Sequence, residues 1–159
     1  MTRAFRAIHR KWRRYREFSP VTRRAFRISL LQIPAIRVGL RLQGFKAYAA
    51  LLEDSVPARR GLAPPGSCAD IERGFHAAVR YLPMKGSCLS RSLALCRVLR
   101  RFGQDARLHV GVDRAKSDLG AHAWVEVGAR PMGKDGARRE QFHLLTTATR
   151  PAALEASTS

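Results

Sequence analysis

Two residues of this chain, Cys88 and His122, have the types and setting of a cysteine nucleophile and its base. Cys88 begins the helical pattern of residues 88–102, where a thiol faces backbone N–H groups that have no partner inside the helix. Such groups stabilise a thiolate and can also hold a developing oxyanion. His122 lies in the alternating segment 121–127, and an imidazole that accepts the thiol proton completes the minimal set for chemistry through a thioester.

A tight turn after this segment predicts which residues face each other across a hairpin. Gly128 at the first position of a two-residue turn, followed by Ala129, fits type II′ geometry. Facing residues point to the same side of a sheet, so the register predicts side-chain neighbours. The register pairs Val127 with Arg130, Val125 with Met132, Trp124 with Gly133 and His122 with Asp135.

Asp135 is therefore predicted to orient His122 and to stabilise its charged form, the third role in a Cys-His-Asp set. Pro131 restricts this strand to a sheet edge, because proline has no N–H for the ladder. A slip of one residue would turn the carboxylate to the other face. Glu126 is the alternative by strand parity and Glu140 is more remote, so Asp135 and Glu126 both remain candidates.

The elements that must position these residues form a helical half followed by a strand-rich half. Apolar spacing predicts one helix from about Ser67 to Leu82 and another from Cys88 to about Phe102, where Gly103 ends it. Alternation predicts strands at residues 107–112, 121–127 and 141–146, with an extended piece at 130–135. Helices followed by an antiparallel sheet indicate an α+β fold, in which the helix that carries Cys88 packs on a small sheet.

Residues 2–54 predict two or three further helices in front of this unit. Ser19 and Pro20 form a cap and a first-turn proline, so a helix should begin there. Pro34 is expected to kink or divide that helix, and Gly44 to interrupt the segment that follows.

Proline and glycine at residues 55–66 mark a boundary in the chain. We expect a basic helical region at 1–60, a catalytic domain at 61–150 and a flexible tail at 151–159. The formal net charge is +18, and residues 1–60 hold 15 of the 30 Lys and Arg but only 3 of the 12 Asp and Glu. Such a surface attracts phosphate, anionic lipid or an acidic protein and says little about the fold.

Several classes of protein are disfavoured by the composition. The chain has three cysteines, an odd number, so no disulfide framework is expected. The cysteines lack the paired spacing of metal sites and the histidines have no ligand neighbours at such spacing, so no metal or other cofactor is expected. No segment approaches the ~18 apolar residues of a membrane span, and the start does not read as a signal peptide. A reducing cytoplasm is the expected location.

Three segments together resemble the transglutaminase-like leader peptidases of lasso-peptide biosynthesis. They are residues 86–95, residues 99–112, and residues 121–126 with the sequence Ala-His-Ala-Trp-Val-Glu. The resemblance covers about residues 67–145 in order and at normal spacing. It implies a papain-like cysteine peptidase with Cys88 as nucleophile, His122 as base and Asp135 near the acidic position. In this chain Gly128-Ala129 replaces the Asp-Gly turn expected of the family.

The resemblance also implies a reaction and its partners. Enzymes of this family remove the leader from a ribosomally made precursor, so that a macrolactam synthetase can close the ring. Residues 1–60 are too short, too helical and too basic for the leader-binding domain fused to some members, so the chain resembles the split type. The implied partners are the precursor peptide, a separate leader-binding protein (a RiPP recognition element) and the lasso macrolactam synthetase, without nucleic acid. The basic helices would dock one of the proteins.

Two other functions fit parts of the sequence. A nucleic-acid or anionic-surface binding module would use the positive charge and the aromatic residues interleaved with Arg in residues 5–18, but it gives no role to Cys88 and His122. An acyl or amide transferase would use the same triad, with an amine in place of water to resolve the thioester. The sequence does not separate hydrolysis from transfer, because both share the acyl-enzyme.

Overall fold

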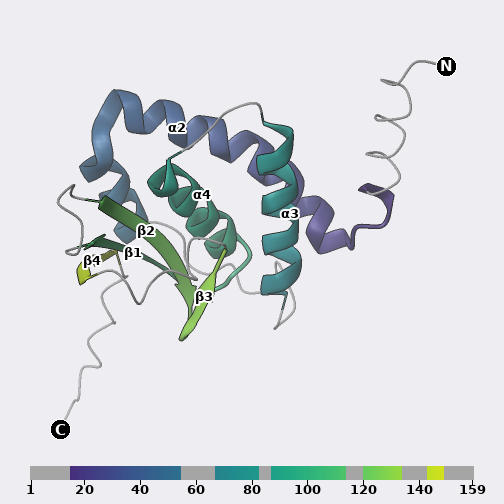
Figure 1. The fold of residues 1–159 in the computed structure, drawn as a ribbon. Helices are drawn as coiled ribbons and strands as arrows, with labels where there is room; N and C mark the ends of the chain where they lie inside the picture. The colour runs from purple at the N-terminus through teal and green to yellow at the C-terminus, as the bar shows by residue number, and fades with distance from the viewer. Residues whose placement is uncertain (1–14, 55–66, 83–86, 114–119, 134–142, 149–159) are drawn as a thin grey trace, which may run out of the picture.

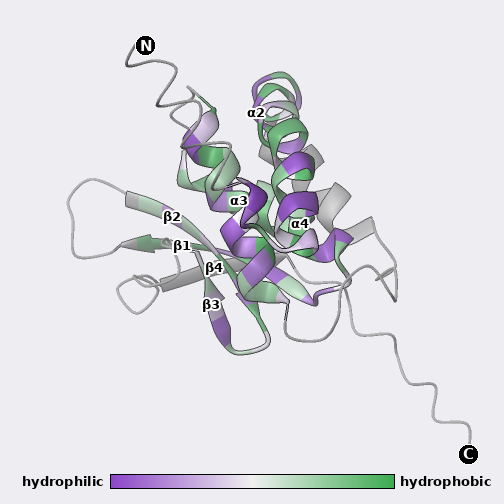
Figure 2. Ribbon diagram, turned by 90° about the vertical axis from the view of Figure 1, so that its right-hand side faces the viewer, coloured by the Kyte–Doolittle hydropathy of each residue, from purple (hydrophilic) through white to green (hydrophobic). Residues whose placement is uncertain are grey.

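The computed structural model describes residues 15–54, 67–82, 87–113, 120–133 and 143–148, with side chains for 15–44, 67–82, 87–112 and 121–133. The described helices are α2 (Pro20–Asp54), α3 (Cys68–Tyr81) and α4 (Cys88–Arg101), and the strands are β1 (Ala106–Asp113), β2 (Gly120–Val127), β3 (Arg130–Met132) and β4 (His143–Ala148). The strands form one antiparallel sheet in the order β3-β2-β1-β4. The helices lie on one side of it (Figure 1, Figure 2), which confirms the predicted α+β fold.

Helix α2 begins at Pro20, where the sequence predicts a start. Ser19 caps it, because the backbone N–H of Thr22 donates to Ser19 Oγ at 3.1 Å. The prediction that Pro34 divides the helix is wrong, since helical backbone angles continue through it. The predicted interruption at Gly44 is confirmed, because this residue has non-helical angles (φ 74°, ψ 176°). Proline removes only one hydrogen bond from a helix, whereas the left-handed angle at Gly44 redirects the chain. Figure 1 shows the resulting bend in α2.

One hydrophobic core joins the three helices to one face of the sheet. The buried side chains at its centre include Ile36 of α2, Ile71 and Phe75 of α3, Leu93 and Leu99 of α4, and Leu108 and Val125 of the sheet. Helix α2 is therefore part of the scaffold that holds α4. The predicted boundary at residues 60–61 lies outside the described residues and stays a prediction.

Helices α2 and α3 cross closely because Gly74 has no side chain. A Cβ atom at this position would lie 2.4 Å from the carbonyl oxygen of Thr22, nearer than any real contact allows. Close by, the carboxylate of Asp70 accepts hydrogen bonds from the hydroxyls of Ser19 (3.0 Å) and Thr22 (3.1 Å). The start of α2 is thus bonded to the first turn of α3.

The β2–β3 hairpin has the predicted register, with Val127 opposite Arg130 and Val125 opposite Met132. Gly128 has φ 61°, the left-handed value that a primed two-residue turn needs at its first position. Pro131 lies on the edge strand, as predicted. Pro131 has no N–H, so its pair with Glu126 cannot be a hydrogen-bonded one, and the hydrogen-bonded pairs are those of Val125 and Val127. The odd-numbered residues of β2 therefore direct their N–H and C=O groups toward β3.

This ladder ends at Met132. Gly133 has φ 76°, and its N–H donates to Glu72 Oε1 of α3 at 2.9 Å instead of continuing along β2. The predicted pairing of Trp124 with Gly133 is therefore wrong, because the left-handed backbone of Gly133 turns the chain out of the strand. Asp135 lies outside the described residues, and its place opposite His122 stays a prediction.

The contact between Glu72 and β3 predicts a dependence of stability on pH. A hydrogen bond from His76 lowers the pKa of Glu72, and the Gly133 N–H adds to this against the opposing effect of burial. A carboxyl whose pKa is lower in the folded protein stabilises it above its unfolded pKa of about 4.3, and loses that contribution as the pH falls through the folded value. We expect Glu72→Gln to have a lower Tm than the native chain at neutral pH, with the gap narrowing below about pH 4.3.

Thermal denaturation followed by circular dichroism, from neutral pH to about pH 3, measures this gap. Glu17→Gln removes the same charge at an exposed position and controls for the change in net charge. A Tm difference for Glu72→Gln that stays constant over the whole range would contradict the assignment.

Candidate active site

Ser87 places Cys88 at the first position of α4. Its backbone is extended (φ −63°, ψ 160°), and its Oγ accepts the N–H of Ser90 at 3.2 Å, as an N-cap residue does. The cap uses the amide of Ser90, whereas the amides of Cys88 and Leu89 have no acceptor within the helix. These two amides are the groups that could hold an oxyanion beside the thiol.

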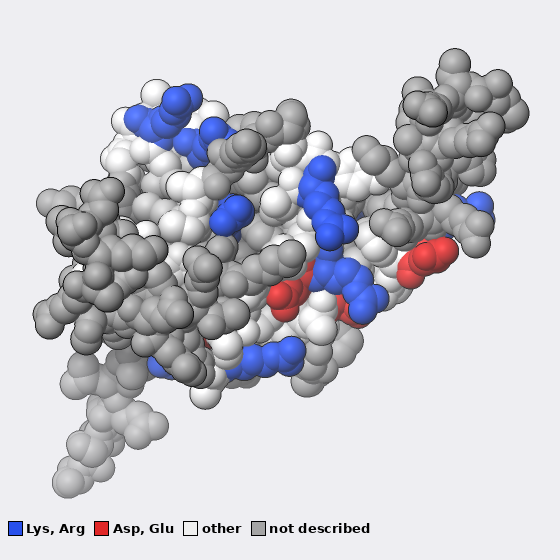
Figure 3. Space-filling view, viewed as in Figure 1, with Lys and Arg blue, Asp and Glu red and all other residues white. Residues whose placement is uncertain are grey.

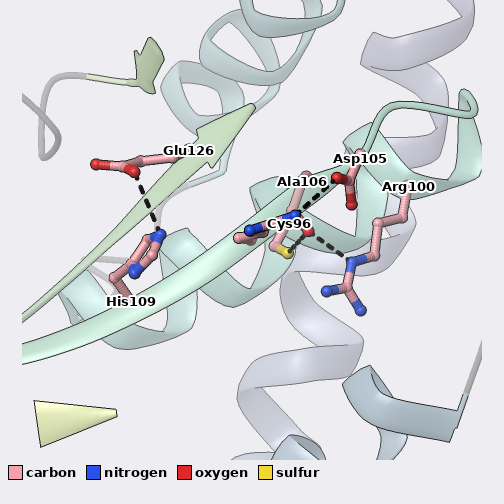
Figure 4. A network of polar contacts seen from close by, with 7 residues as sticks. Cys96, Arg100, Asp105, Ala106, His109 and Glu126 are labelled. Atoms are coloured by element: carbon pink, nitrogen blue, oxygen red, sulfur yellow. Dashed lines mark hydrogen bonds and ion pairs between the residues drawn. The ribbon is translucent and has the colours of Figure 1, made fainter. Parts of the chain in front are cut away.

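Beyond Cys88, side chains of α4 bind the backbone of the sheet at two places. The Ser92 hydroxyl donates to the carbonyl oxygen of Ala123 in β2 at 2.8 Å. Farther along the helix, Arg100 Nε (2.8 Å) and the Cys96 thiol (3.5 Å) donate to the carbonyl oxygen of Ala106 in β1 (Figure 4). The helix is thereby fixed in register with both central strands.

The contact of Ser92 lies at the part of the β2 edge that β3 does not reach. Ala123 is an odd-numbered residue of β2, so its carbonyl points to the side of β3, which ends at Met132 opposite Val125. Ser92 supplies the hydrogen bond that a longer β3 would have supplied. The first turn of α4 therefore covers the edge of β2.

The thiol of Cys88 lies beside the strand that carries His122. Its Sγ is 3.9 Å from the carbonyl oxygen of Ala121, the residue that precedes His122. Both Cys88 and His122 are partly exposed. The structure thus brings together the two segments that carry the predicted nucleophile and base.

Three aromatic rings form a row on one face of the sheet. His122 and Trp124 are stacked, with ring centroids 6.2 Å apart and planes 19° from parallel. His109 of β1 stacks on Trp124, at 5.5 Å and 18°. The register places His109 directly opposite Trp124 and Gly111 opposite His122, so β1 has no side chain opposite the His122 ring. Trp124, at 5% exposed, is fixed by its surroundings.

Glu126 holds the far end of this row. Trp124 Nε1 donates to Glu126 Oε1 at 3.2 Å, and His109 Nε2 lies 3.4 Å from Glu126 Oε2 (Figure 4). Burial lowers the pKa of His109, and the charge of Glu126 partly offsets this effect. Glu126, the alternative partner of His122, is thus linked to it through the indole of Trp124. Strand parity predicts that His122, Trp124 and Glu126 share a face, but not that His109 joins them.

The other two thiols are in poorer environments for reaction. Cys96 is fully buried, and burial raises its pKa to about 11. Burial also raises the pKa of Cys68, whose thiol donates to Gln104 Oε1 at 3.0 Å. All three cysteines are free. Cys96 behaves as the small buried residue that its place on the apolar side of the helix predicts.

Sequence reasoning missed two residues that position the site. Ser92 has a visible signal, since it is a small polar residue one helical turn after Cys88 on the side that packs on the sheet. Glu72 has no such signal, because its bond to Gly133 joins residues 61 positions apart. Among the described residues no group of three or more His, Cys, Asp or Glu could hold a metal ion, and no described helix is both long and apolar enough to cross a membrane.

Comparison with known proteins gives one match. A family model described as the transglutaminase-like superfamily matches residues 30–147, which is well over half of the 159-residue chain. The match includes Cys88 and His122, and it begins within α2. Searches of curated proteins and of solved structures found no match.

The Ser92 contact predicts a loss of stability on substitution. Ser92→Ala leaves the carbonyl of Ala123 without its buried hydroxyl donor, which should lower the free energy of unfolding by about 1–3 kcal/mol. Ser90→Ala is the matched control, because that hydroxyl bonds only to Ser87 of its own helix cap. Chemical denaturation measures both changes. An equal or larger loss in Ser90→Ala would argue against the role given to Ser92.

The thiol environments predict an order of alkylation. Iodoacetamide reacts with thiolate, and with a pKa of about 11 the thiolate fraction of Cys96 at neutral pH is of order 10⁻⁴. We expect Cys88, partly exposed at a helix start, to be labelled first, then Cys68, then Cys96. Peptide mapping by mass spectrometry over time gives the order. Faster labelling of Cys68 would count against Cys88 as the reactive thiol.

Proposed function

The chain belongs to the transglutaminase-like superfamily, and on this premise we propose that it is the leader peptidase of a lasso-peptide pathway, with Cys88 as nucleophile and His122 as base. The superfamily consists mainly of cysteine peptidases and acyl transferases. The observation that carries the proposal is the placement of the Cys88 thiol at the capped start of α4. Its Sγ lies 3.9 Å from the carbonyl oxygen of Ala121, the residue before His122.

The proposed reaction has two steps. His122 accepts the thiol proton as Cys88 Sγ attacks the carbonyl carbon at the end of the leader, and the oxyanion is held by backbone N–H groups at the start of α4. The carbon–nitrogen bond breaks, the amine of the core peptide leaves with the proton from His122, and the leader stays on Cys88 as a thioester. His122 then takes a proton from water, which attacks the thioester and releases the leader carboxylate and the free thiol.

The acidic residue of the triad is proposed to be Asp135. Because the ladder ends at Met132 and Gly133 turns out of the strand, Asp135 would have to reach His122 from beyond the described part of the hairpin. Such an approach needs no continuous pairing along the edge that α4 covers. Glu126 would then have the supporting role that its bond to Trp124 indicates.

The surface of α2 supports the proposed protein partners. Residues 20–44 contain five Arg and no Asp or Glu. The same helix exposes Leu31 (78%), Val38 (54%) and Leu42 (79%), at a spacing that places them along one stripe. On the face seen in Figure 3, the described residues show several basic side chains and few acidic ones. We assign this stripe to a leader-binding protein or the synthetase, whose contact face would be acidic and apolar.

The decisive experiment is a cleavage assay on a lasso-peptide precursor from the gene neighbourhood of this chain. The protein is incubated with the precursor, with and without a separate leader-binding protein, and the products are read by mass spectrometry. We expect a free leader and core, faster with the partner. Cys88→Ala should abolish cleavage, and His122→Ala should lower the rate by several orders of magnitude. Each variant should retain the circular dichroism and Tm of the native chain to within the small cost of its side-chain change.

The same assay distinguishes the alternatives. An added amine that appears on the leader in place of water would identify a transferase, since both reactions pass through the thioester. Full cleavage by Cys88→Ala would disprove the assignment of the nucleophile. No cleavage under any condition, together with tight and salt-sensitive binding of unrelated RNA, would favour the nucleic-acid module.

A further inference from the structure

We propose that Trp124 and Glu126 are positioning residues for His122: Trp124 sets the plane of the imidazole by stacking, and Glu126 fixes the indole. This inference rests on the proposed function, in which His122 is the base. It adds a support for the imidazole that comes from the same strand, two residues along β2. It also gives a function to a polar network that the reaction does not otherwise use.

The geometry of the stack is what makes Trp124 suitable. A histidine on a strand can rotate about two side-chain bonds, and a base must hold one ring nitrogen toward the thiol. The near-parallel rings of His122 and Trp124, 19° apart, restrict the imidazole to one plane. Gly111 of β1, opposite His122, has no side chain, and the stacked indole of Trp124 is a neighbour on this face that can define that plane.

Trp124 is itself fixed from three directions. It is nearly fully buried, its other stacking contact is with His109, and its indole N–H is bound by Glu126 at 3.2 Å. The carboxylate of Glu126 also lies 3.4 Å from His109 Nε2, so a single group contacts the central indole and one of the two outer rings of the row. The indole cannot turn without breaking these contacts. A rigid support of this kind keeps the base in place while substrate enters and leaves.

Loss of the support should appear in the turnover number more than in substrate binding. A displacement of about 1 Å in a catalytic group can cost about 10²-fold in rate, and we expect a drop of that order in kcat for Trp124→Leu with KM little changed. Trp124→Phe keeps an aromatic ring for stacking but loses the bond to Glu126, so its rate should lie between those of the native chain and Trp124→Leu. Glu126→Gln keeps an oxygen that accepts the indole N–H and should retain more activity than Glu126→Ala.

The control separates positioning from stability, since Trp124 is buried. Phe75→Leu replaces a buried ring of α3 by an aliphatic chain, and it should lower Tm without lowering kcat. The Glu126 pair keeps the test valid if Trp124→Leu does not fold, because Glu126 is only partly buried. The stack also has a spectroscopic signature: in NMR spectra, the ring protons of His122 should lose the ring-current shift of the indole in Trp124→Leu but not in Glu126→Gln.

A readout without peptide substrate distinguishes failure of this inference from failure of the proposed function. The rate of Cys88 alkylation at neutral pH reports whether His122 helps to form the thiolate. We expect His122→Ala, Trp124→Leu and Glu126→Ala all to slow labelling, and Trp124→Phe to slow it less than Trp124→Leu does. Unchanged labelling in His122→Ala would overturn the proposed thiol–imidazole pair. Slow labelling in His122→Ala, with native rates in folded Trp124→Leu and Glu126→Ala, would overturn only the positioning role.

Discussion

The hydrogen bond from Ser92 to the carbonyl of Ala123 is the contact on which the geometry of the site depends. It links α4 to the edge of β2 one helical turn after Cys88, where β3 no longer pairs. A buried carbonyl at such an edge would be unsatisfied without a donor, and this gives the helix a specific position along the strand. The bonds of Arg100 and Cys96 to Ala106 fix the other half of the helix.

The helices around α4 make that position rigid. Gly74 lets α3 approach α2 to backbone contact, and the carboxylate of Asp70 joins the starts of the two helices. Their apolar faces meet α4 in one core, so the basic N-terminal part of the chain is structural as well as charged. The family match, which begins at residue 30, agrees with this, because it includes much of α2 in the same unit as the strands. The charged and apolar residues that α2 exposes are thus held at a fixed position relative to the proposed site.

Sequence alone predicts those features whose cause lies within a few residues. The start of α4 at Cys88 follows from helical periodicity, and the pairing of Val125 with Met132 follows from a glycine turn and a two-residue period. Prediction fails where a distant group intervenes. The ladder stops at Met132 because the chain turns at Gly133 (φ 76°), where Glu72 of α3 binds the backbone N–H. Pro34 stays helical within a helix whose neighbouring residues Ile33 and Ile36 are buried in the core.

The odd-numbered and even-numbered residues of β2 have different roles at the proposed site. Its odd-numbered residues pack on α4 and supply the carbonyls that locate the helix and the Cys88 thiol, while its even-numbered residues carry His122 and the rings that restrain it. A single strand thereby sets the position of the nucleophile and the orientation of the base. Backbone carbonyls of β2 set the position of the nucleophile, and side chains of β2 set the orientation of the base. A change on the ring face, as in Trp124, should therefore alter the base while the bonds that place α4 remain intact.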